Sequence, residues 1–127
     1  MDILFHPIGI IQSPFKSRSE TPRGGEGFRD TEAEIILDDK YLEGAADMQP
    51  GKQYMLLFYF HKAEGYKLTV PIGGVGAMTG LFSTHSPNRP NGIGVSYITV
   101  TKISGNRISF TGVDMIDGTP VLDIKSY

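Results

Sequence analysis

Short runs of β-branched and aromatic residues, each bounded by Gly, Pro, Asp or Ser, are the feature that most restricts the fold of this 127-residue chain. Runs of this length and composition are typical of strands rather than helices. We predict strands at Ile8–Ile11, Ala33–Leu37, Tyr54–Phe60 and Val95–Val100. A hairpin is also predicted over Thr101–Phe110, because the residues alternate on both sides of a Ser-Gly-Asn turn whose glycine can adopt a positive φ.

The sequence predicts at most one short helix. Asp39 is expected to cap a turn that runs through Tyr41 and Ala46 and ends at Gln49-Pro50-Gly51. An open sheet of strands this apolar would need covering helices, whereas a closed sheet leaves no long unpaired edge. We therefore predict an all-β fold, mainly an antiparallel β-barrel with at most one short helix, in a single domain over residues 1–127 without an added C-terminal domain.

Composition excludes several classes of protein. The chain has no Cys, so it has no disulfide framework, thiolate metal site or thiol nucleophile. No apolar run approaches the ~20 residues of a membrane span, and the first residues lack the basic region and cleavage site of a signal peptide, so we expect a cytoplasmic protein without membrane contact. The net charge of −2 argues against nucleic-acid affinity of the molecule as a whole but does not address a local surface.

Acidic and basic residues are segregated along the chain. Residues 30–47 hold seven acidic side chains and one basic side chain, whereas residues 77–113 hold three basic side chains and no acidic one. A second basic group lies early in the chain and consists of Lys16, Arg18, Arg23 and Arg29. If the two basic segments meet in space, they would offer a binding surface to an anionic ligand; the alternative is that they are ordinary solvated charges.

The glycine-rich segment Gly73–Gly80 has only a superficial similarity to a dinucleotide-binding turn. Its spacing from Gly74 is G-x-G-x-x-x-G, and the residues that should open a helix contain Pro87 and Pro90. The acidic residue expected about 20 positions further on is also absent. We interpret this segment as a flexible linker between two barrel strands.

Residues 81–96 form the first of two segments in which a site can be sought. Two prolines fix φ and push the residues before them to extended conformations. A stiff, irregular loop is therefore expected to carry His85, Asn88, Arg89 and Asn91. Rigid loops position binding groups well, although the prolines can equally shape a barrel corner whose polar groups face water.

Residues 113–125 form the second segment, in which three carboxylates surround a Gly-Thr-Pro turn: Asp114, Asp117 and Asp123. Asp123 is flanked by the apolar Leu122 and Ile124 in a strand pattern, so its side chain is expected on the opposite face of the strand from both. Asp117 is either a ligand-binding carboxylate or a turn residue that caps its own Gly-Thr backbone.

At these segments the chain resembles a known family. LFSTHSPNRPNGIGVS and GVDMIDGTPVLDIKSY, with IGIIQSPFKSRSETPR near the start and LLFYFHK in the middle, are similar to motifs of the TsaA-like (TrmO-type) methyltransferases, in the same order from Ile8 to Tyr127. The resemblance implies an antiparallel β-barrel that binds S-adenosylmethionine and forms a homodimer, with the cofactor near the subunit interface. The implied reaction is methyl transfer to N6 of threonylcarbamoyladenosine, the modified base next to the anticodon of certain tRNAs.

Carried over position by position, the resemblance implies a set of cofactor-binding residues: Pro22, Arg23, Gly24, His61, Lys62, His85, Val95, Ile116, Asp117, Gly118 and Thr119. The turn at 117–119 is expected to offer backbone N–H groups and a carboxylate to the nucleoside. Gly24 replaces a usual Gln of the family, and His85 replaces a usual Arg, which exchanges a permanent cation for a group that is largely neutral at pH 7. Arg89, in an acid-free stretch, is expected to bind substrate phosphate.

Methyl transfer from a sulfonium is an in-line displacement that needs no metal, so no metal site is expected. An acceptor nitrogen whose lone pair is delocalised into a carbonyl would be helped by a base, and the sequence does not rank the candidates Asp114, Asp117, Asp123 and His85. His61 is either a cofactor ligand or a partly buried residue that ends a strand. The alternatives to a tRNA methyltransferase are a methyltransferase of the same barrel that acts on a small molecule or another RNA, and a non-catalytic S-adenosylmethionine-binding module.

Overall fold

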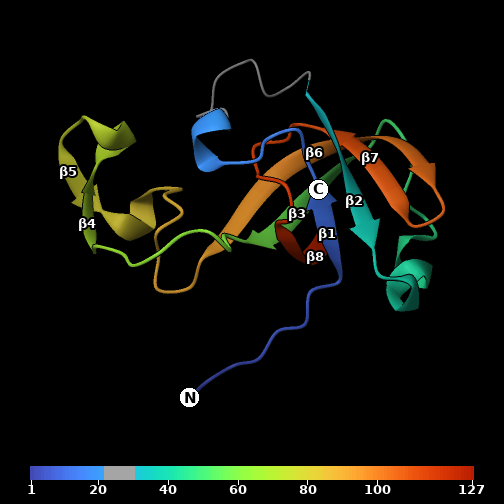
Figure 1. Ribbon diagram of the computed structural model, residues 1–127, viewed down its shortest axis with the longest axis horizontal. Coiled ribbons are helices and arrows are strands. Elements are labelled where there is room, and N and C mark those ends of the chain that lie inside the picture. The colour runs from blue at the N-terminus through green and yellow to red at the C-terminus, as the bar shows by residue number, and fades with distance from the viewer. Residues whose placement is uncertain (22–30) are drawn as a thin grey trace.

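Six antiparallel strands close into a barrel in the order β1-β2-β7-β6-β3-β8 (Figure 1). The computed structural model of the protein describes residues 1–21 and 31–127. The barrel strands are β1 (Gly9–Gln12), β2 (Glu32–Leu37), β3 (Gln53–Tyr59), β6 (Ile93–Ser104), β7 (Arg107–Thr111) and β8 (Pro120–Ser126). The predicted all-β, mainly antiparallel architecture is confirmed, and the strands expected at Ile8–Ile11, Ala33–Leu37 and Tyr54–Phe60 begin and end within one residue of β1, β2 and β3.

β6 corrects one part of the prediction. The strand expected at Val95–Val100 and the first arm of the expected hairpin are one continuous strand of 12 residues. Its first half pairs with β3 and its second half with β7, and the register to β7 shifts between Val100 and Lys102. This irregularity lets a single strand bend from one neighbour to the other. The predicted turn is confirmed, because Gly105 has a φ of +61° between β6 and β7.

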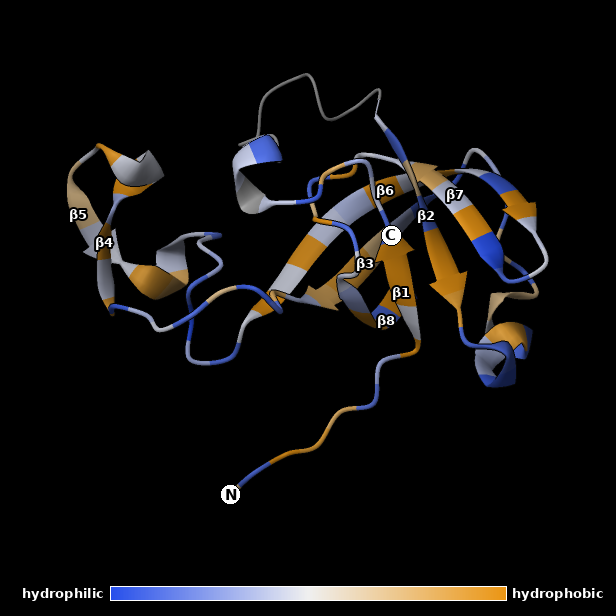
Figure 2. Ribbon diagram, viewed as in Figure 1, coloured by the Kyte–Doolittle hydropathy of each residue, from blue (hydrophilic) through white to orange (hydrophobic). Residues whose placement is uncertain are grey.

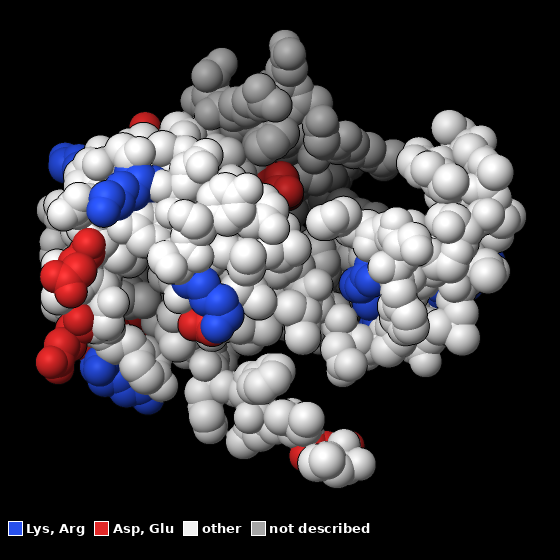
Figure 3. Space-filling model, turned by 180° about the vertical axis from the view of Figure 1, so that it is seen from behind, with Lys and Arg blue, Asp and Glu red and all other residues white. Residues whose placement is uncertain are grey.

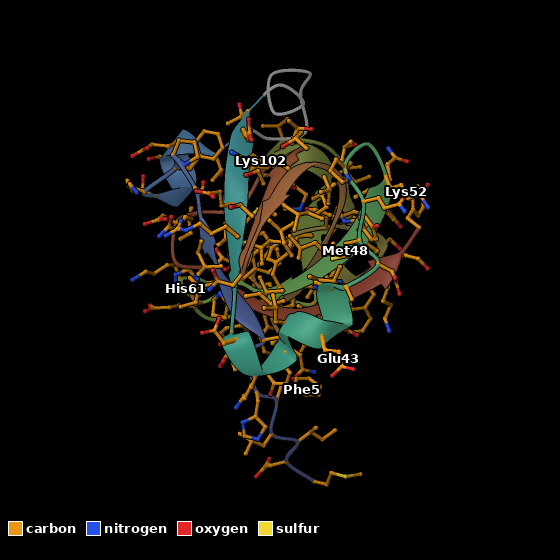
Figure 4. All side chains as sticks on the ribbon, turned by 90° about the vertical axis from the view of Figure 1, so that its right-hand side faces the viewer. Phe5, Glu43, Met48, Lys52, His61 and Lys102 are labelled. Atoms are coloured by element: carbon orange, nitrogen blue, oxygen red, sulfur yellow. The ribbon has the colours of Figure 1, made fainter. Side chains whose placement is uncertain are left out.

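The interior of the barrel is filled by the alternate residues of each strand that point inward, as a two-residue period requires. Those that are fully buried include Ile11, Ile35, Leu56, Ile98, Val100, Ile108, Phe110 and Val121. Seen from the side of the β6–β7 turn, their carbon-rich side chains fill the space that the strands enclose (Figure 4). The core therefore supports the strand ends, and functional groups can stand only at those ends or on the outer face.

Every helix in the described part of the chain is a short 3₁₀ segment, and none of them is long and apolar enough to cross a membrane. The longest, η3 (Asp39–Ala45), packs over one end of the barrel, and η1 (Arg18–Glu20) follows β1. The predicted helix was placed correctly, but its cap was wrong. Asp38 caps η3, since its carboxylate accepts a hydrogen bond from the Lys40 N–H at 3.3 Å.

A small hairpin stands apart from the barrel in place of the expected flexible linker. β4 (Thr69–Pro71) pairs with β5 (Met78–Gly80), and the 3₁₀ turns η4 (Ile72–Gly74) and η5 (Leu81–Ser83) follow the two strands (Figure 1). The linker prediction failed because Gly73 and Gly74 make a tight turn at positive φ instead of leaving the segment unstructured. The hairpin carries hydrophobic residues, as the barrel does (orange in Figure 2), and Val75 at its tip is almost fully exposed.

Candidate functional site

The turn between β7 and β8 is held against the segment that follows β1. The Asp117 carboxylate accepts the Ser13 N–H at 3.0 Å and pairs with the Lys16 ammonium at 3.1 Å. These two contacts, the backbone hydrogen bond first, lower the pKa of Asp117 below its ordinary value. Asp117 is therefore ionised at neutral pH. It does not cap its own Gly-Thr backbone, which was the alternative that the sequence left open.

The backbone N–H groups of this turn are already used within the protein. The Asp117 N–H donates to the Phe15 carbonyl at 2.7 Å, and the Gly118 N–H donates to the Ile11 carbonyl at 2.8 Å. The Thr119 N–H and hydroxyl both donate to the Ile116 carbonyl. The expectation that the turn offers N–H groups to a nucleoside is therefore wrong. What it can offer is the remaining acceptor capacity of the Asp117 carboxylate, which is about a third exposed.

His61 follows the end of β3 and lies beside the same turn. A β-carbon placed on Gly118 would come within 3.8 Å of the His61 Nε2, and Gly118 itself is exposed. The His61 Nδ1 is buried and has no hydrogen-bond partner among the described residues. Burial and then the neighbouring Lys62 charge lower the pKa of His61, against a smaller opposite effect of the Tyr59 carbonyl. The imidazole is therefore neutral at pH 7, with Nε2 next to a position that no side chain occupies.

A second polar group lies at the same end of the barrel. The Asp114 carboxylate, between β7 and β8, accepts a hydrogen bond from the Ser96 hydroxyl at 2.8 Å. Asp114 is exposed to water, yet enough protein surrounds its carboxyl group that desolvation raises the pKa, offset in part by Ser96 and by the nearby His85. Ser96 is buried at an inward position of β6. The structure thus brings His85, from the proline-rich loop, to the carboxylate-rich turn.

The other carried-over residues are placed unevenly. Lys62 is exposed next to His61, and Ile116 is half-buried beside the 117–119 turn. Val95 points away from the barrel interior, because it is paired with Leu57 and its neighbours in β6 are the inward-facing residues. Pro22, Arg23 and Gly24 lie outside the described residues.

Arg89 supports the proline-rich loop from within. Its Nη1 donates to the Thr84 carbonyl at 2.9 Å and to the Ser86 carbonyl at 3.0 Å. The guanidinium carbon lies 6.0 Å from the centroid of the Phe82 ring. Arg89 therefore fixes the conformation of the segment that carries His85, and its phosphate-binding role stays a prediction.

One residue of each basic segment lies at a common surface, while Arg23 and Arg29 lie outside the described residues. Lys16 and Lys102 line one shallow depression, but Glu32, Glu34 and Asp117 line it too. On the face shown in Figure 3, basic and acidic side chains are interspersed, with uncharged surface between them. A larger cleft of about 990 Å³ lies between η3 and the end of β8, at the opposite end of the barrel from His61 and Asp114.

Sequence reasoning missed Ser13 and Ser96, which hold the two carboxylates. Ser13 belongs to the Ser-Pro-Phe motif, and its Oγ also accepts the Phe15 N–H at 3.0 Å. Ser96 carried a signal that could have been used, because a hydroxyl at an inward position of an apolar strand needs a partner when buried. Nothing in the local sequence of Ser13 indicates a partner 104 residues away.

Comparison with known proteins identifies the family of the chain. Residues 10–127 match the family model of the tRNA-methyltransferase O N-terminal domain. An S-adenosyl-L-methionine-binding protein of Archaeoglobus fulgidus is 36% identical over 98% of this chain and 89% of its own length. A mouse tRNA (adenine(37)-N6)-methyltransferase is 38% identical over 99% of this chain and 31% of its own length. The crystal structure of TrmO from Pseudomonas aeruginosa superposes with a TM-score of 0.81 at 32% identity, over all of this chain and 56% of that one. The chain belongs to the TrmO family of S-adenosylmethionine-dependent methyltransferases.

Proposed function

We propose that this protein transfers a methyl group from S-adenosylmethionine to N6 of threonylcarbamoyladenosine in tRNA, in the cytoplasm. The observation that carries the proposal is the meeting of His61 with the turn that holds Asp117 and Gly118 at one end of the barrel, although the two segments lie far apart in the chain. The charge of His85 influences Asp114 at the same end. His61 and the 117–119 turn, which the family resemblance assigns to the cofactor, thus lie side by side, which supports the proposal.

The groups at this end fit a zwitterionic nucleoside. The Nδ1 of the neutral His61 ring has no hydrogen-bond partner in the part of the chain that the structure describes, and Gly118 leaves room beside the Nε2 for a ligand atom. Asp117 is a permanent carboxylate that can accept hydrogen bonds from hydroxyl or amino groups, and the exposed Lys62 can pair with a carboxylate. When bound, the cofactor supplies an electrophilic methyl group on a sulfonium. The task of the chain is then to hold donor and acceptor in line and to exclude water.

A homodimer is the second part of the proposal. The outer face of β3 and β6 carries an apolar surface made of the cross-strand pairs Met55 with Tyr97, Leu57 with Val95, and Tyr59 with Ile93. Tyr59 is 46% exposed and Tyr97 is 50% exposed. The ring of Tyr97 packs against that of Tyr127, with the two ring centroids 4.5 Å apart. Contiguous apolar surface of this kind favours association of two copies. Val95 would then join the cofactor site from this face.

Titration calorimetry with S-adenosylmethionine tests the cofactor site. His61→Ala is expected to weaken binding at least about tenfold, which corresponds to about 1.4 kcal/mol. His6→Ala is the matched control, because His6 is an exposed histidine of the N-terminal segment and should leave the affinity unchanged. Equal affinities of the two variants would contradict the proposed site.

The acceptor is tested by incubating the protein and S-adenosylmethionine with tRNA that does or does not carry threonylcarbamoyladenosine, and analysing the nucleosides by mass spectrometry. Methylation of the modified tRNA alone supports the proposal. The second candidate is a methyltransferase of the same barrel that acts on a small molecule, and the interspersed charges of Figure 3 favour it. Cofactor binding without methylation of either tRNA, and without salt-dependent tRNA binding, would select this candidate.

A further inference from the structure

The structure distinguishes the three carboxylates among the four groups that the sequence left unranked as proton acceptors. Asp117 accepts a backbone N–H and pairs with Lys16, so it holds its charge too firmly to take up a proton. Asp123 lies on the outer face of β8, where its carboxylate pairs with Lys125 at 3.2 Å and accepts the Ile124 N–H at 2.9 Å. Asp123 is therefore occupied on the outer face of the barrel, and Asp117, although it lies beside His61, is held in its ionised form by its own partners.

Asp114 has the surroundings that the other two lack. It is exposed, so a substrate can reach it, and the side chain that holds it is the buried Ser96, through one hydrogen bond of 2.8 Å. In residues 1–21 and 31–127 no lysine or arginine pairs with it. The groups that favour its charged form are the Ser96 hydroxyl from β6, then its own backbone, then the charge of His85 from the preceding loop. Desolvation raises the pKa of Asp114, whereas the contacts of Asp117 lower the pKa of that carboxyl, so Asp114 is the better proton acceptor of these two.

We infer that Asp114 is the proton acceptor for the nitrogen that is methylated, an inference that rests on the proposed function. The lone pair of a carbamoyl nitrogen is delocalised into the adjacent carbonyl, so the nitrogen is a poor nucleophile while it keeps its proton. In the balanced step a nitrogen–carbon bond forms, the sulfur–carbon bond of the methylsulfonium breaks with its electrons left on a neutral thioether, and the nitrogen proton passes to the Asp114 carboxylate.

The first test compares Asp114→Asn with the matched control Asp123→Asn in the full chain. Binding of S-adenosylmethionine is measured by calorimetry, and methyl transfer to threonylcarbamoyladenosine-containing tRNA is measured in a single turnover. Asp114→Asn should keep its cofactor affinity and slow the transfer by about 10²–10⁴-fold. Asp123→Asn should match the wild type in both. Transfer by Asp114→Asn at the wild-type rate would overturn the inference, whereas no transfer by the wild type itself would refute the proposed function.

The second test uses Ser96→Ala and does not depend on activity alone. Loss of the hydroxyl removes a hydrogen bond to the charged form, so the Asp114 carboxyl should titrate at higher pH by ¹³C NMR of the ligand-free protein. The fall of the single-turnover rate at acid pH should then occur at a pH that is higher by the same amount. If Asp114 had only a structural role, the pH dependence of the rate would not follow its titration. A fall in rate that stays at the same pH while the carboxyl titration moves would overturn the inference. An unchanged titration would show that the Ser96 bond has no such effect and would overturn it as well.

Discussion

Replacing Gly94 by alanine is predicted to destabilise the barrel, because two aromatic rings occupy the space where a side chain would begin. A β-carbon on this residue would lie 2.5 and 2.6 Å from two ring atoms of Phe58 and 2.8 Å from one of Phe60. These rings pack edge to face with centroids 5.2 Å apart, and Phe58 is 2% exposed. Neither ring can move aside as the end of a flexible chain could, so Gly94→Ala forces the core or the strand to shift.

The size of the effect follows from two opposing contributions. Overpacking a well-packed core costs about 1–3 kcal/mol. Replacing glycine by alanine within an ordered strand recovers about 0.5–1 kcal/mol through the smaller entropy of the unfolded chain. The clash outweighs the entropy and leaves a loss of roughly 1–2 kcal/mol, or a fall in Tm of roughly 4–10 °C for a chain of this length.

Thermal unfolding followed by circular dichroism measures this loss, and Gly80→Ala is the matched control. Gly80 has a φ of −65° and no atom within 4 Å of its β-carbon position, so alanine there should leave Tm unchanged or slightly higher. A Gly94→Ala variant as stable as Gly80→Ala would refute the reasoning from ring packing.

Three further predictions concern charge and assembly. Asp117→Asn should lower Tm at neutral pH. Because folding lowers the pKa of Asp117, its carboxylate stabilises the fold above the ordinary pKa of about 3.9. The difference in Tm from wild type should vanish as pH falls through the pKa of Asp117 in the folded state. Asp114→Asn should not lower Tm at pH 7. Because the folded state raises the pKa of Asp114, this carboxyl stabilises the fold in full only below its unfolded pKa of about 3.9, and the stabilisation is lost as pH rises through its pKa in the folded state. Sedimentation equilibrium should give the mass of two chains for wild type and for the control Leu42→Glu on η3. Tyr97→Glu, which changes the proposed interface, should give the mass of one chain. A wild-type monomer at micromolar concentration would contradict the dimer.

The barrel could be predicted because the sequence patterns that indicate its strands and turns lie within each segment. Alternation of apolar residues and the turn glycines indicated the strands and the hairpin without reference to distant residues. The strand boundaries that failed depended on partners. Residues 93–104 form one strand only because β3 and β7 lie on successive parts of it, and Asp38 rather than Asp39 becomes the cap because the Asp38 N–H donates to the Ile8 carbonyl and ends β2 there.

The candidate site could be named from the sequence as a set of residues, whose binding roles stay predictions, but the arrangement of these residues could not be predicted. Family motifs named His61, His85 and the 117–119 turn, but their contacts cross between strands and have no local signal. The turn was expected to have unused N–H groups, yet the N–H groups of Asp117 and Gly118 donate to carbonyls of β1 and of the segment that follows it. The order of the candidate bases likewise depended on Lys16 and Ser96, residues that meet Asp117 and Asp114 only in the folded chain.

The hydrogen bonds of the 117–119 turn to the β1 segment have a consequence for the order of events during synthesis. Ser13 must wait for a partner that lies 104 residues later, which at about 5–20 residues per second is roughly 5–20 seconds of translation. Until Gly118 has emerged, the Ile11 carbonyl has no donor and the barrel has no closing seam. An unfinished chain therefore has neither the seam nor the groups that flank His61, and a ribosome-bound fragment ending before residue 117 should not retain S-adenosylmethionine.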